Sequence, residues 1–83
     1  MKKVCVIGLG YTGLPTAAMF ATHGCQVVGV DINPSIIETI SQGKVHIHEP
    51  GLQELVREAV FNGQLTVSLT PESADAFIIE VPT

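Results

Sequence analysis

Short apolar runs alternate along the chain with longer segments in which apolar residues recur every three or four positions. The runs at 4–7 and 26–30 show no polar alternation, which predicts strands buried on both faces. The run at 65–69 alternates apolar and polar residues and predicts a third strand at a sheet edge. The run at 76–81 predicts a fourth strand.

Three segments have helical spacing. Residues 12–23 place small and apolar side chains on one face and predict the first helix. Asn33 as N-cap and Pro34 at the first helical position predict a second helix that ends before Gly43. The third has the most regular spacing, with one apolar face formed by Leu52, Leu55, Val56, Ala59 and Val60.

The alternation of strands and helices predicts parallel strands joined by right-handed crossovers. The expected fold class is therefore α/β, a doubly wound parallel sheet with strand order 3-2-1-4. Between the third and fourth strands, Thr70, Pro71 and Glu72 have the cap and first-turn chemistry of one or two short helical turns.

Composition narrows the class of protein. The 83 residues, 46% of them hydrophobic and 14% charged, allow one small domain or a piece of a larger one. Four Lys and Arg against eight Asp and Glu give a net charge of −4, which argues against a nucleic-acid partner. No apolar stretch approaches the ~20 residues that a membrane helix needs, and no signal peptide is recognised, so we expect a cytoplasmic protein without a membrane partner.

The first motif that indicates a function is a GxGxxG at 8–13, between the first strand and the first helix. Gly8 permits a tight turn, Gly10 leaves no side chain between backbone and phosphate, and Gly13 lets helix and strand pack closely. Free N–H groups and the positive end of the helix dipole then face an anion. The alternative is a glycine-rich turn without a ligand. The strand–turn–helix context favours a dinucleotide-binding, Rossmann-type fold.

Asp31 ends the second strand, 18 residues after Gly13, where such folds place the acceptor for the adenosine ribose. A carboxylate repels a 2′-phosphate, and residues 32–34 supply no cation, so NAD is favoured over NADP. The alternative for Asp31 is a solvated aspartate at a strand end. FAD remains an alternative cofactor on the glycine motif alone.

Other reactive side chains are interpreted as structural. His46, His48 and Glu49 could be imagined as metal ligands, but a loop with solvent-facing or packing histidines is favoured, and no metal is predicted. Cys5 lies inside a strand without a neighbouring base and is read as a core residue. Cys25 stands in an unrelated context, so we expect reduced thiols.

Four segments together resemble the N-terminal part of the UDP-glucose/GDP-mannose dehydrogenase family. They are GLGYTGLPTAAMFA at 8–21, GVDIN at 29–33, HIHEPGL at 46–52 and IIEVPT at 78–83. The resemblance implies a parent enzyme that performs two successive NAD-dependent oxidations at C6 of a nucleotide sugar, through a cysteine thioester. The catalytic cysteine, lysine and asparagine of the family belong to later regions, so no catalytic residue is expected in this chain.

The resemblance also implies roles for single residues. Tyr11 and Thr12 would contact the cofactor phosphates through the loop, and Thr83 would contact the cofactor near its other end. Asp31 would bind the adenosine ribose. Many members place a Lys or Arg shortly after this acid, where the chain has Ser35 and Ile36, so a supplementary phosphate contact is not expected.

We therefore expect residues 1–83 to be the N-terminal part of a dinucleotide-binding domain, truncated after the fourth strand. The rest of the cofactor domain and the substrate domain would be absent, and open strand edges would invite pairing with another copy. The resemblance implies a nucleotide-sugar substrate and a homo-oligomer. A competing hypothesis is a complete, non-catalytic nucleotide-binding module.

Overall fold

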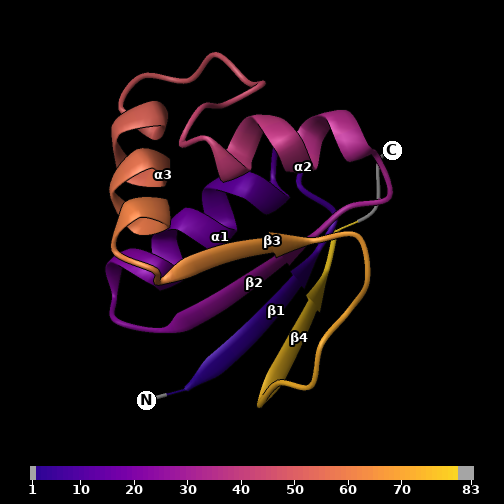
Figure 1. Ribbon diagram of the computed structural model, residues 1–83. Coiled ribbons are helices and arrows are strands. Elements are labelled where there is room, and N and C mark those ends of the chain that lie inside the picture. Colours follow the sequence, from indigo (N-terminus) through magenta and orange to yellow (C-terminus); the bar gives the residue numbers. More distant parts are fainter. Residues whose placement is uncertain (1, 81–83) are drawn as a thin grey trace.

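The computed structural model describes residues 2–80 and shows one four-stranded parallel sheet with three helices packed on one of its faces (Figure 1). The strands are β1 (Lys3–Ile7), β2 (Gln26–Val30), β3 (Leu65–Ser68) and β4 (Ala76–Ile79). Their order is β3-β2-β1-β4, and each neighbouring pair is parallel. The expected α/β fold and strand order are confirmed.

The helices are α1 (Gly13–Thr22), α2 (Pro34–Ser41) and α3 (Leu52–Phe61). The face of α1 toward the sheet is small and fully buried, and consists of Leu14, Ala17, Ala18 and Ala21. Three alanines on this face let α1 lie close to the strands beneath it. No helix among residues 2–80 is long and apolar enough to cross a membrane.

β1 is a central strand, because it pairs with β2 on one side and β4 on the other. Val4, Cys5 and Val6 are at most 3% exposed, as expected for a strand covered on both faces. Val4 and Val6 belong to the core under the helices, and Cys5 belongs to a smaller cluster on the opposite face. Cys5 is therefore a core residue, with a free thiol.

The connection from β3 to β4 contains no helix, so the helical turns expected at 70–72 are wrong. The reason is the distance that this connection has to span. β4 lies three strand spacings from β3, about 14 Å, and starts at the opposite end of the sheet. Residues 69–75 extended span about 24 Å, but as a helix only about 10 Å. Ala74 packs on the cluster around Cys5 as the segment passes.

Several boundaries and one side chain differ from expectation. β1 begins one residue early, at Lys3, and α1 (Gly13–Thr22) is one residue shorter at each end than the expected 12–23. The third strand ends at Ser68, one residue early, and β4 is regular only to Ile79, while Val81 lies outside the described residues. Leu55, expected on the buried face of the third helix, is 43% exposed. The expected edge position of β3 is confirmed.

Candidate functional site

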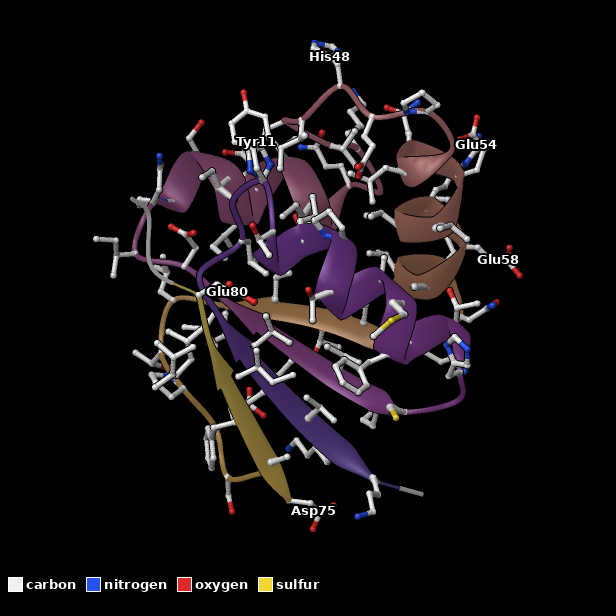
Figure 2. The ribbon with its side chains drawn as sticks, turned by 180° about the vertical axis from the view of Figure 1, so that it is seen from behind. Tyr11, His48, Glu54, Glu58, Asp75 and Glu80 are labelled. Atoms are coloured by element: carbon white, nitrogen blue, oxygen red, sulfur yellow. The ribbon has the colours of Figure 1, made fainter. Side chains whose placement is uncertain are left out.

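The predicted site residues that the structure describes gather at the carboxyl end of the sheet. Residues 8–13 form the turn from β1 into α1, and Asp31 follows β2 directly. Glu80 follows β4, and Figure 2 shows it at the end of that strand, below the turn that carries Tyr11. Parallel strands end at one edge, so residues distant in sequence meet there.

Two glycines of the motif are required by the packing of the turn. Gly8 has φ +99°, and a Cβ atom there would overlap the carbonyl oxygen of Glu80. A Cβ atom on Gly13 would overlap the carbonyl oxygen of Gly8. The N–H of Gly8 donates to the Val30 carbonyl at 2.7 Å, which ties the turn to β2. Neither glycine can be replaced without moving backbone atoms.

Gly10 is different, because the fold alone gives no reason for a glycine there. Its φ is not in the left-handed region, and a Cβ atom on it would meet no heavy atom within 4 Å. The space above Gly10 is open to solvent. A bound phosphate close to the backbone would require this space, as the motif predicts.

The start of α1 carries free hydrogen-bond donors. Four consecutive N–H groups have no hydrogen-bond partner among residues 2–80, namely those of Gly10, Tyr11, Thr12 and Gly13. Thr12 does not cap the helix with its side chain, and the first turn holds no acidic residue. At α2, by contrast, the Asn33 side chain accepts the N–H of Ser35 at 2.9 Å. The positive end of α1 is thus left for an external anion.

Asp31 lies beside the glycine turn, and each oxygen of its carboxylate accepts a backbone N–H. Oδ2 accepts the N–H of Leu9 at 3.0 Å, and Oδ1 accepts the N–H of Asn33 at 2.9 Å. The residue is half-buried. Sequence reasoning predicted that Asp31 would stand at this edge, and the structure places it in direct contact with the motif.

Sequence reasoning missed the contribution of Leu9 and Gly29. The Leu9 side chain is fully buried under the turn. A Cβ atom on Gly29 would lie 3.1 Å from both Leu9 methyl carbons, so this glycine makes room for Leu9 within β2. A glycine inside an otherwise β-branched strand is the signal that could have indicated such close packing.

The sequence analysis also singled out Thr83 and the two residues Ser35 and Ile36. Thr83 lies outside the described residues. Ser35 is exposed and Ile36 packs against the core, so the segment after Asp31 presents no cation to a phosphate. This arrangement is the one expected where a 2′-phosphate is not bound.

The histidine loop does not form a metal site among residues 2–80, where no three potential ligands come together. His46 is half-buried, and both of its ring nitrogens are buried without a hydrogen-bond partner in the described part of the chain. His48 is exposed and stands at the outer end of the loop in Figure 2.

A hollow of about 260 Å³ lies between α1 and the segment that leads into α3. It is lined by Pro15, Met19, Thr22, His23, Glu49, Pro50, Leu52 and Leu55. None of these residues belongs to the predicted site. The glycine turn instead lies at the carboxyl edge of the sheet, where residues 10–12 are exposed.

The comparisons with known proteins agree on one family. Residues 2–83 match the UDP-glucose/GDP-mannose dehydrogenase family, NAD binding domain. The UDP-N-acetyl-D-mannosamine dehydrogenase of Campylobacter jejuni is 60% identical over 82 residues, which cover 99% of this chain and 20% of that protein.

Two solved structures are similar over 98% of the chain. The UDP-N-acetyl-mannosamine dehydrogenase of Staphylococcus aureus has a TM-score of 0.94 and 56% identity, and 19% of that chain is covered. A UDP-glucose dehydrogenase of Pyrobaculum islandicum has a TM-score of 0.88 and 42% identity, and 20% of that chain is covered.

The chain spans about a fifth of the length of the curated relatives that it matches. The matched part carries the glycine turn, the free N–H groups and Asp31, which fit the pyrophosphate and ribose of a dinucleotide. The chain belongs to the UDP-glucose/GDP-mannose dehydrogenase family, in which it corresponds to the NAD-binding domain.

Proposed function

We propose that residues 1–83 form the N-terminal, NAD-binding part of a nucleotide-sugar 6-dehydrogenase. The remainder of the cofactor domain and the substrate domain would be supplied by sequence beyond this chain. The family match over residues 2–83 supports this proposal, as does coverage of about a fifth of the relatives. The proposed parent is a cytoplasmic homo-oligomer, and light scattering on the parent protein would test its oligomeric state.

The observation that carries the proposal is the open space at Gly10 beside four N–H groups that have no partner in the described part of the chain. In the proposed complex these groups donate hydrogen bonds to the cofactor pyrophosphate, and the missing side chain at Gly10 lets the phosphate approach. Tyr11 and Thr12 contribute through their backbone. Bound NAD would supply the hydride acceptor, and Thr83 is proposed to contact it near its other end.

Asp31 is proposed to bind the adenosine ribose. Each carboxylate oxygen already accepts one N–H, and an ionised carboxylate has about four acceptor positions, so capacity remains for the ribose hydroxyls. The negative charge disfavours a 2′-phosphate at the same place, and Ser35 and Ile36 offer no compensating cation. The proposed cofactor preference is therefore NAD over NADP.

The proposed substrate is UDP-N-acetyl-D-mannosamine. Its C6 alcohol would be oxidised through the aldehyde to the carboxylate with two NAD, which yields a precursor for polysaccharide synthesis. The support is the names of the Campylobacter and Staphylococcus relatives, together with the LPTAA, DIN and HI-x-EP segments. UDP-glucose is the alternative. Incubation of the parent protein with either sugar nucleotide, followed by NADH absorbance, separates the two.

The test of the cofactor site is a calorimetric NAD titration of the Gly10→Ala variant. We expect NAD affinity to fall at least about tenfold, because the new methyl group occupies the space of the phosphate. Glu58→Ala, on the exposed surface of α3, is the control and should bind as the wild type does. Unchanged NAD affinity in Gly10→Ala would contradict the proposed site.

A further inference from the structure

We propose that Asp31 also positions the phosphate-binding part of the turn, by holding the N–H of Leu9 through Oδ2. This inference rests on the proposed NAD site and assigns Asp31 a second role, separate from ribose binding. Loss of the carboxylate would then weaken phosphate binding even for a ligand without a ribose.

Among residues 2–80, the hydrogen bonds that tie the turn to β2 and to Asp31 come from two residues, Gly8 and Leu9. The N–H of Gly8 donates to the Val30 carbonyl at 2.7 Å, and the N–H of Leu9 donates to Asp31 at 3.0 Å. The Leu9 side chain fills the space at Gly29. From Gly10 onward the next backbone bond is from the N–H of Leu14 to the Gly10 carbonyl, at 3.1 Å.

The peptide groups that carry the free donors therefore start immediately after Leu9. The Leu9 N–H points inward to the carboxylate, whereas the four that follow have no partner among residues 2–80. Without Asp31, the Leu9 N–H would be left unpaired in a partly buried position, and the Gly8–Leu9 peptide, which leads into the free donors, would lose the hydrogen bond that fixes its orientation.

Asp31 is itself well held. Its own N–H donates to the Ser68 carbonyl at 3.3 Å, and its Oδ1 accepts the N–H of Asn33 at 2.9 Å. Asn33 in turn caps α2 through the N–H of Ser35. The carboxylate is thus fixed by β3 and by the start of α2, which makes it a rigid support for the turn.

The two effects of Asp31 on a bare phosphate ligand have opposite signs. Its negative charge repels an anion at the turn, so removal of the charge alone would strengthen phosphate binding. Loss of the Leu9 hydrogen bond would weaken phosphate binding, because the donors would no longer be preorganised. A ribose-binding role alone predicts the first effect only.

The experiment is a titration of the chain with inorganic pyrophosphate, followed by NMR at the amides of Gly10 and Gly13. We expect Asp31→Ala to bind pyrophosphate at least about fivefold more weakly than the wild type. Asp31→Asn removes the charge but keeps an oxygen that can accept the Leu9 N–H, so it should bind pyrophosphate at least as tightly as the wild type and clearly more tightly than Asp31→Ala. Exchange of the Leu9 amide with deuterated solvent should accelerate in Asp31→Ala and less in Asp31→Asn.

Asp75→Ala is the matched control. The Asp75 carboxylate also accepts a backbone N–H, that of Lys3 at 2.8 Å, but at the opposite end of the sheet (Figure 2). This variant should not lose pyrophosphate affinity. A thermal melt of each variant monitors folding. If Asp31→Ala does not fold, Asp31→Leu replaces it, because it also lacks an acceptor for the Leu9 N–H and should likewise bind pyrophosphate more weakly than the wild type.

Equal or tighter pyrophosphate binding by a folded Asp31 variant that lacks an acceptor, Asp31→Ala or Asp31→Leu, would overturn the inference and leave the NAD site standing. A wild type that responds to NAD but not to pyrophosphate would overturn it as well, because the turn would not hold a phosphate by itself. A wild type in which NAD leaves Gly10 and Gly13 unaffected would instead refute the proposed function.

Discussion

The glycine turn has an inner side and an outer side that differ in packing and in exposure. The inner side, formed by Gly8, Leu9 and Gly13, is closely packed against β2 and the end of β4. The outer side, Gly10 to Thr12, is exposed, has no atoms near a Cβ at Gly10 and carries N–H groups without partners among residues 2–80. Folding explains the inner side, whereas the outer side has no role in the fold and fits the proposed phosphate ligand.

This difference shows that one short motif combines two separate requirements. Gly8 and Gly13 keep backbone atoms from colliding, which is a condition for the turn to exist. Gly10 keeps a surface clear that the fold does not use. Substitutions on the two sides should therefore separate stability from binding, and the following predictions test that separation.

Gly13→Ala should have the largest effect. Its new Cβ would collide with the carbonyl oxygen of Gly8, and neither backbone can yield without distortion of the turn. We expect the free energy of unfolding to fall by about 4 kcal/mol, measured by urea titration. Gly10→Ala is the control, with a change of less than about 0.5 kcal/mol. Equal losses in both variants would remove the distinction between the two sides.

Leu9→Ala should reduce the free energy of unfolding by about 3 kcal/mol, because it empties a fully buried site under the turn. Leu69→Ala is the control, because it removes the same atoms from a side chain that is 49% exposed. It should change the free energy of unfolding by less than about 0.5 kcal/mol. Comparable urea midpoints for the two variants would show that the inner side is not part of the core.

Gly29→Ala should lower the free energy of unfolding by about 1 kcal/mol, because its methyl group would press on the two methyl carbons of Leu9. In a Leu9→Ala background the same methyl group enters vacated space, so this loss should vanish. A double-mutant cycle would then give a coupling of about 1 kcal/mol. Additive effects would contradict direct packing of Leu9 on Gly29.

Tyr11→Ala should have the smallest effect. Its side chain is 85% exposed, so the free energy of unfolding should change by less than about 0.5 kcal/mol. The proposed contact to the phosphates uses the backbone, so NAD affinity measured by calorimetry should change less than about threefold. A larger loss of affinity with unchanged stability would assign a direct role to the phenol ring.

Most of the fold was predictable because its signals are local. The runs at 4–7 and 26–30 are short, apolar and bounded by turn residues, and Asn33 with Pro34 marks a helix start that the structure confirms. The prediction of helical turns at 70–72 was wrong because it used only local cap chemistry. Whether the connection must be extended depends on the distance from β3 to β4. That distance cannot be derived from the spacing of residues along the sequence.

The candidate site was predictable to a similar extent. The motif and Asp31 follow from spacing, and the structure brings them together at one edge of the sheet. The bond from the Leu9 N–H to Asp31 and the space that Gly29 leaves for Leu9 were not predictable. Both depend on the register that sets Ile7 opposite Val30 across β1 and β2, which is a property of the folded sheet.

The open space at Gly10 has a consequence for how the sequence changes over generations. Selection for a folded chain alone would retain Gly8 and Gly13 and would let residue 10 drift to any small side chain. A copy of the domain that had lost its ligand would thus be expected to keep the turn and lose the middle glycine first. All three glycines are present here, which is the pattern that continued selection for binding would maintain.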